Sequence, residues 1–159
     1  MKSNLKWYII SLLLIFFDQL TKYFIRKNFA LYQTRQITSF LALTYTTNTG
    51  TVFGLFEGQN TIFSALIFII LLFLIFSARG IVKDIGSIGK IAICLIFCGG
   101  VGNLIDRIFL GKVVDFIDLQ WNYKNIWPVF NLADSYVFVG VWIMIVTYFL
   151  KYFKRKYQS

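Results

Sequence analysis

Four long apolar runs set the pattern of this chain, and they are separated by two mixed segments and one short loop. The runs cover about residues 7–25, 61–78, 91–109 and 132–150. Each has roughly the 20 residues that an α-helix needs to cross the hydrocarbon core of a bilayer. The pattern therefore predicts four transmembrane helices in a single polytopic membrane domain over residues 1–159.

The two mixed segments, about 26–60 and 111–130, favour other structures. In the first, apolar residues recur on alternate positions from Ile37 to Tyr45 among several threonines, which is typical of short strands. The second holds tryptophan and tyrosine residues that suit a membrane–water interface. We expect a membrane all-α fold, with a small β-sheet from the first segment and a short loop or helix from the second.

The first run also invites a different interpretation, because Lys2 and Lys6 precede it as they would in a secretory signal. It lacks a small-residue cleavage site and carries Asp18 and Lys22 near its far end. It is therefore interpreted as a retained first span. Asp18 and Lys22 are spaced i,i+4, so they can pair on one helix face. This pair either neutralises two charges within the span or contacts a substrate directly.

Charge orients the spans. The 159 residues are 58% hydrophobic, with a mean hydropathy of +0.69 and a net charge of +9 at pH 7. The cations flank the apolar runs, so they predict topology and no nucleic-acid partner. The N-terminal tail, the loop over 79–90 and the C-terminal tail are dense in lysine and arginine, which makes that side cytoplasmic. Both mixed segments then lie on the extracytoplasmic side.

The composition also narrows the chemistry. The chain has no histidine, which excludes Ser-His-Asp catalysis, Cys-His catalysis and histidine-ligated metal sites. Cys94 and Cys98 lie one helical turn apart in an apolar run, where free cysteine packs as a small hydrophobe. We expect no metal and no cofactor. Nothing in the sequence requires more than a monomer.

Acidic residues gather in one part of the chain. Of seven acids, four lie between Asp106 and Asp134, among residues that otherwise belong in hydrocarbon. A carboxylate costs roughly 2.5–3.5 kcal/mol at the middle of a span. Several acids in one part of the chain therefore indicate that their carboxyls have a function. By topology, several polar residues converge on the extracytoplasmic face, namely Asp18, Asn48, Asn103, Asp115, Asn131 and Asp134.

Individual acids leave alternatives open. Asp106 is interpreted as a structural carboxylate that pairs with Arg107 or another cation. Asp134 fits either an N-cap box with Asn131 or a catalytic role near a helix terminus, where N–H groups favour its anion. Asp115 and Asp118 both have apolar neighbours, and spacing alone does not separate them.

Two carboxyls that face each other cannot both ionise easily, so they share a proton over a wide pH range. The ionised one can take a proton from water while the protonated one donates to a carbonyl oxygen. Such a pair hydrolyses peptides without a metal, a covalent intermediate or a histidine. The pattern of acids is consistent with this chemistry.

These residues resemble the lipoprotein signal peptidases (signal peptidase II) of bacteria, over nearly the whole chain. Val52 is a departure, since the family usually has alanine there. The matching motifs are Asp18-Gln19-x-Thr21-Lys22, Asn48-x-Gly50 with Phe53-Gly54, Gly102-Asn103-Leu104-Ile105-Asp106-Arg107, Val113-Val114-Asp115-Phe116 and Phe130-Asn131-Leu132-Ala133-Asp134.

The resemblance implies an intramembrane aspartyl endopeptidase of the bacterial cell membrane, acting near the extracytoplasmic face. It would remove signal peptides from prolipoproteins, cutting before a cysteine that carries diacylglycerol. Its catalytic pair would be Asp115 and Asp134, with Asp118 a non-catalytic neighbour. The residues implied to line or support the substrate site are Asn48, Gly50, Asn103, Arg107 and Asn131, and those implied to brace it are Asp18, Lys22 and Asp106.

Two other functions fit some of the same residues. Intramembrane Asp and Lys are also typical of proton relays, so a small proton-coupled transporter subunit is the main alternative. The clustering of acids at one face argues against it. A structural adaptor, in which the acids only pair with Lys22, Arg107 and Lys112, is the second alternative.

Overall fold

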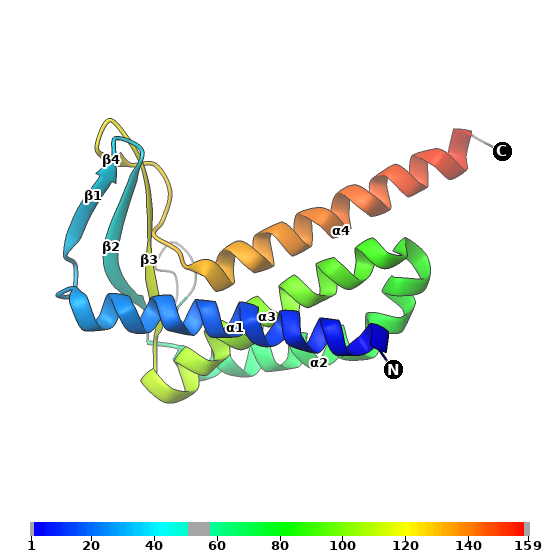
Figure 1. Ribbon diagram of the computed structural model, residues 1–159, viewed down its shortest axis with the longest axis horizontal. Coiled ribbons are helices and arrows are strands. Elements are labelled where there is room, and N and C mark those ends of the chain that lie inside the picture. Colours follow the sequence, from blue (N-terminus) through cyan, green and yellow to red (C-terminus); the bar gives the residue numbers. More distant parts are fainter. Residues whose placement is uncertain (1, 51–57, 158–159) are drawn as a thin grey trace.

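The computed structural model describes residues 2–50 and 58–157 (Figure 1). Val52, where the sequence departs from the family pattern, and the Phe53-Gly54 motif lie outside these residues. The elements, in chain order, are α1 (Lys2–Asn28), β1 (Thr34–Thr38), β2 (Leu41–Asn48), α2 (Asn60–Ile85), α3 (Ser87–Leu110), β3 (Val113–Trp121), β4 (Lys124–Asn125) and α4 (Leu132–Tyr157).

All four helices are long and apolar enough to cross a membrane, which confirms the predicted number of spans. Each predicted run lies within one helix, and the helices continue past the runs through polar residues at their ends. In Figure 1 the sheet stands at one end of the helices, while both termini and the α2–α3 turn lie at the other end. The chain is therefore a multi-pass membrane protein with its strands gathered beyond one end of the spans.

The sheet is antiparallel with strand order β1-β2-β3-β4. This confirms the predicted membrane fold with a small sheet, but one detail differs. The segment 111–130, expected as a loop or short helix, supplies β3 and β4. A half-buried strand shows alternating apolar and polar residues, and that alternation is the usual sequence signal. Residues 113–116 of β3 are all buried, so this signal is absent there.

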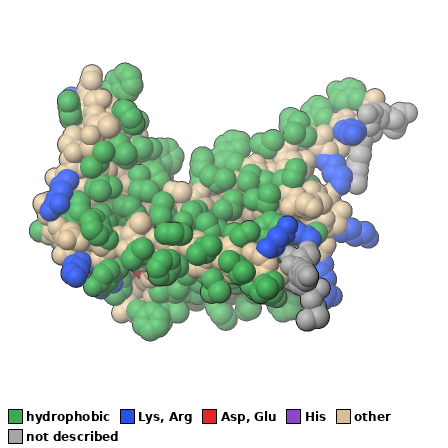
Figure 2. All heavy atoms as spheres, in the orientation of Figure 1, with side chains coloured by type: hydrophobic (Ala, Val, Ile, Leu, Met, Phe, Trp, Pro, Cys, Tyr) green, Lys and Arg blue, Asp and Glu red, His purple; other side chains and the backbone are tan. Residues whose placement is uncertain are grey.

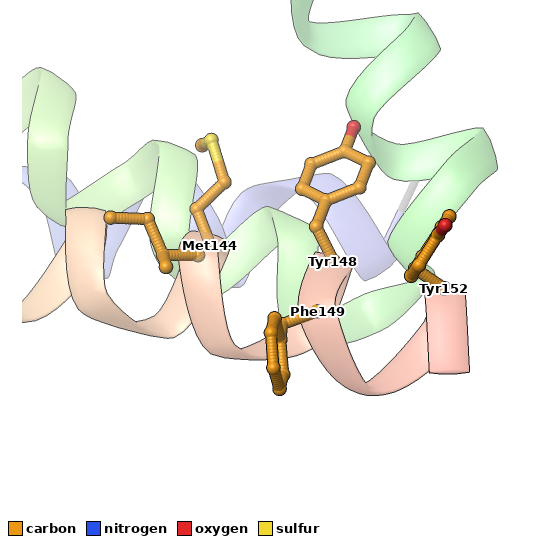
Figure 3. Close-up of a pocket in the computed structure, with 5 residues that line it drawn as sticks. Met144, Tyr148, Phe149 and Tyr152 are labelled. Carbon is orange, nitrogen blue, oxygen red and sulfur yellow. The ribbon is translucent and has the colours of Figure 1, made fainter. Parts of the chain in front are cut away.

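The surface of the helices is apolar between two cationic ends (Figure 2). Large side chains on α2 stand far out of the protein; Phe73 is 70% exposed and Phe76 is 82% exposed. In water such exposure would be costly, whereas lipid tails accommodate it at no cost. The exposed apolar surface is therefore the face that meets the hydrocarbon.

Glycines bring α3 and α4 into close contact. A Cβ placed on Gly99 would lie 2.3 Å from the backbone oxygen of Ala133, and one on Gly140 would lie 2.8 Å from that of Ala92. Small residues permit this approach between membrane helices. Because Asp134 follows Ala133 directly, the contact at Gly99 also determines where the first turn of α4 lies.

We expect Gly99→Ala to destabilise the protein by about 1–3 kcal/mol through overpacking, since its neighbour at 2.3 Å is backbone that cannot rotate away. Gly80→Ala is the matched control. It lies within α2 with nothing inside 4 Å of a new Cβ, so it should be neutral or stabilise by about 0.5–1 kcal/mol. Thermal unfolding in detergent compares the two. Equal melting temperatures for both variants would contradict the close contact.

Candidate active site

Asp115 on β3 and Asp134 in the first turn of α4 are both hydrogen-bonded to one residue, Asn131. The Asn131 amide nitrogen donates to Asp115 Oδ1 at 2.7 Å, and the Asn131 backbone N–H donates to Asp134 Oδ2 at 3.2 Å. The same amide nitrogen also donates to the backbone oxygen of Val114 at 3.3 Å. Two acids that lie 19 positions apart in the sequence (134 − 115) are thus joined by a single residue.

The Asn131–Asp134 pair forms the predicted N-cap box. The Asp134 backbone N–H donates to Asn131 Oδ1 at 2.9 Å, while the Asp134 carboxylate accepts the Asn131 backbone N–H. Asp134 is therefore a helix-capping residue, and its capping partner Asn131 also binds Asp115. The cap uses only Oδ2 of this carboxylate, and Oδ1 accepts the Asn103 amide at 2.7 Å.

Asp115 is 4% exposed in the strand. Burial, and to a smaller extent the charge of Asp134, raise the pKa of its carboxyl to about 8. The hydrogen bond from Asn131 acts in the opposite direction. Asp115 therefore holds its proton more readily than an exposed carboxyl does.

Lys22 forms ion pairs with two further carboxylates. Its ammonium is 2.9 Å from Asp18 Oδ2 and 3.2 Å from Asp106 Oδ2, with all three residues at most 2% exposed. Asp18 Oδ1 accepts the backbone N–H of Ala133 at 2.9 Å, and Asp106 Oδ2 accepts that of Val114 at 3.0 Å. The clamp formed by these three residues therefore holds the residue directly before Asp134 and the residue directly before Asp115.

This arrangement shows which cation pairs with Asp18 and with Asp106. The predicted i,i+4 pair of Asp18 and Lys22 is present and is part of the scaffold of the site. Asp106 pairs with Lys22, a cation from another helix. Its neighbour Arg107 makes its hydrogen bonds elsewhere.

Amides complete the network, and one of them was not among the predicted site residues. Asn103 Oδ1 accepts from Lys22 Nζ at 3.0 Å and from the Asn131 amide at 3.1 Å. Gln19 lies within 3.0–3.1 Å of Asp18 Oδ2, Asp106 Oδ1 and the backbone oxygen of Gly102. The signal that could have identified Gln19 is its place beside Asp18 in an apolar span, where an amide needs partners.

Arg107 belongs to a neighbouring group of contacts. Its guanidinium donates to the backbone oxygen of Gly50 at 2.7 Å and to Asn60 Oδ1 at 3.1 Å, and it lies over the Phe63 ring. Asn48 Oδ1 accepts the Gly50 backbone N–H at 2.8 Å. Asn48, Gly50 and Arg107 are therefore held together beside the acids, while the hydrogen-bonded network of Lys22 joins the other predicted residues.

Asp118 lies apart from Asp115. Residues three apart in a strand point to opposite faces of the sheet. Asp118 Oδ2 accepts from the Thr44 hydroxyl at 2.7 Å and from the Gln120 amide at 2.8 Å, so its contacts lie within the sheet. The strand geometry separates the two acids that spacing alone left equivalent.

Comparisons with known proteins agree on one family. The family model described as signal peptidase (SPase) II matches residues 10–150. The lipoprotein signal peptidase of Wigglesworthia glossinidia brevipalpis is 39% identical over 147 residues, which cover 91% of this chain and 92% of that protein. That of Staphylococcus aureus (strain JH9) is 37% identical over 142 residues, covering 87% of this chain and 84% of that protein.

Solved structures give the same result. A bacterial membrane enzyme determined by the in meso method at 2.3 Å resolution superimposes with a TM-score of 0.81 at 34% identity, covering 91% of this chain and 87% of that one. A second such enzyme, at 1.9 Å resolution, gives 0.77 at 34% identity, covering 89% and 90%. The chain therefore belongs to the signal peptidase II family of membrane peptidases.

Proposed function

We propose that this chain removes signal peptides from prolipoproteins, with Asp115 and Asp134 as its catalytic pair, cutting before a diacylglyceryl-modified cysteine. The observation that carries the proposal is the double contact of Asn131, which bonds to both acids. A carboxyl pair of this kind supplies the base and the acid that peptide hydrolysis requires.

The two acids take different roles. Asp134 lies at a helix N-terminus and accepts two N–H groups, from Asn103 and from the Asn131 backbone, and these contacts favour its anion while burial opposes it. Asp115 is buried in the strand and keeps its proton. Asp134 therefore takes a proton from the attacking water, and Asp115 donates one to the carbonyl oxygen as it becomes tetrahedral.

The remaining site residues support this pair. Asn131 and Asn103 orient the carboxyls, and Lys22 with Asp18 and Asp106 holds the backbone that carries them. The group formed by Asn48, Gly50 and Arg107 lies toward the substrate, where its amides and guanidinium meet the peptide backbone.

The membrane placement follows from charge. The end of the helices that holds both termini also holds the denser lysine and arginine clusters, so we place it in the cytoplasm. The sheet and the acids then lie at the extracytoplasmic face of a single membrane domain, which acts as a monomer. A lipidated cysteine sits at this level, with its acyl chains in the leaflet and the scissile bond near the interface.

The distribution of charges does not favour a transporter. Apart from Asp84, the described acids gather at the sheet end of the helices, whereas a proton path would need titratable groups across the bilayer. The family assignment gives the transporter no support either.

The pH dependence of cleavage tests the proposal. Purified protein in detergent is given a diacylglyceryl-modified prolipoprotein peptide, and mass spectrometry follows the product that begins at the modified cysteine. The rate should fall above about pH 8, because Asp115 loses its proton there. It should also fall at acid pH, because Asp134 then gains a proton.

The same peptide without the diacylglyceryl group is the matched control, and we expect it to be cut far more slowly. Cleavage at one rate from acid to alkaline pH would contradict a shared proton. Equal cleavage of both peptides would contradict the proposed substrate.

A further inference from the structure

A groove separate from the acid pair runs between the sheet-proximal half of α1 and the sheet. Leu20 and Phe24 of α1 line one side, and Leu43 of β2 and Phe116 of β3 line the other. It encloses about 730 Å³, within the range of roughly 300–1,000 Å³ typical of small-molecule sites. The groove is therefore large enough to hold a substantial part of a lipid.

Most of the groove wall is apolar, because the polar side chains Thr21 and Asn28 use their hydrogen-bond donors within α1. The Thr21 hydroxyl lies 2.8–2.9 Å from the backbone oxygens of Phe17 and Asp18, and the Asn28 amide donates to that of Phe24 at 2.8 Å. Their donors are thus used within α1. Such a wall suits a hydrocarbon chain better than a peptide, whose backbone needs hydrogen-bond partners.

The depth of the groove matches one leaflet. From Leu20 to Asn28 the helix rises about 12 Å, at roughly 1.5 Å per residue. Half of a hydrocarbon core is about 15 Å. Because the apolar span ends at Asn28, the groove begins at headgroup level and extends into the acyl region of the adjacent leaflet.

The upper end of the groove is cationic. Lys27 lines it, and Arg26 precedes Lys27 in the last turn of α1. Arg35 of β1 donates to the backbone oxygen of Asn28 at 3.0 Å and lies 4.5 Å from the centroid of the Phe29 ring. Figure 2 shows lysine and arginine at this end of the molecule.

No exposed carboxylate of the described residues offsets this charge nearby. Of the described acids at this end, four, Asp18, Asp106, Asp115 and Asp118, are at most 4% exposed, and the fifth, Asp134, is half-buried. The rim therefore complements a negatively charged headgroup at the membrane surface.

We propose that this groove binds an anionic phospholipid of the surrounding membrane, with one acyl chain along Leu20 and Phe24 and its phosphate against Lys27. The bound chain packs on Phe116, which follows Asp115 in β3. The lipid thereby supports the strand from the face opposite the acid.

Native mass spectrometry tests this site. The full chain in detergent is mixed with equal amounts of phosphatidylglycerol and phosphatidylcholine that carry the same acyl chains. We expect one phosphatidylglycerol to be retained preferentially. Lys27→Gln should lower its occupancy roughly fivefold, the effect of one cation at a membrane surface. Lys124→Gln, which removes an exposed cation from β4, should leave it unchanged.

A second variant tests the groove itself. Leu20→Trp places a larger ring in the groove and should reduce retention of both lipids, while the melting temperature reports that the variant is folded. Equal retention of the two lipids by the unchanged chain would overturn the proposal. Equal losses in Lys27→Gln and Lys124→Gln, or displacement of the lipid by a diacylglyceryl-modified peptide, would also overturn it.

Discussion

Replacing either Asp115 or Asp134 by asparagine should lower prolipoprotein cleavage by roughly 10²–10⁴-fold, the usual contribution of a general acid or base. Asparagine keeps the shape of the carboxyl but can neither give up nor accept the proton. The fold should persist, since Asp115 is already neutral at pH 7 and Asp134 keeps an oxygen for the helix cap. Initial rates with the diacylglyceryl-modified peptide, together with melting temperatures, measure both expectations.

Asp118→Asn is the matched control, because it makes the same change three residues along β3 on the opposite face of the sheet. Its hydrogen bonds to Thr44 and Gln120 lie within the sheet, so cleavage should stay close to that of the unchanged chain. The assignment of the pair would be wrong if Asp115→Asn or Asp134→Asn kept near-full activity. It would also be wrong if Asp118→Asn lost as much activity as they do.

The second large effect is expected at Lys22. Lys22→Met removes the ammonium between Asp18 and Asp106 and leaves two buried carboxylates without their cation. Breaking a buried ion pair in this way costs roughly 3–5 kcal/mol. Activity should fall as well, because the two carboxylates hold the backbone directly before each acid of the proposed pair. Thermal unfolding and cleavage rates in detergent measure the two effects.

Lys6→Met serves as the control, at an exposed position toward the other end of the same helix. Its effect on the melting temperature should be small, since surface substitutions usually stay within about 0.5 kcal/mol. Adding Asp18→Asn to Lys22→Met should recover part of the lost stability, because it removes one of the two uncompensated charges. If Lys22→Met melted at the same temperature as Lys6→Met, the clamp would have no structural role.

Much of this structure could be predicted from local pattern. Apolar runs of about 20 residues indicated the four helices, and alternation before Asn48 indicated strands. The i,i+4 spacing of Asp18 and Lys22 and the cap box of Asn131 and Asp134 follow from helix geometry within a few residues. These features depend on short-range spacing, which a sequence displays directly.

Other features depend on contacts between distant segments. Continuous burial concealed the first half of β3, and without that strand Asp115 and Asp118 appeared equivalent. The partner of Asp106 lies on α1 and not beside it at Arg107, which only the packing of α1 against α3 reveals. Gln19 joins the network for the same reason, since its acceptors at Gly102 and Asp106 come from another helix.

The most direct test of the paired acids is a crystal structure with a lipidated peptide whose scissile amide is replaced by a hydroxyl-bearing tetrahedral mimic. We predict that carboxyl oxygens of Asp115 and Asp134 both lie within about 2.6–3.2 Å of the mimic's oxygen. A bound mimic whose oxygen contacts only one of these carboxyls, or neither, would contradict the account.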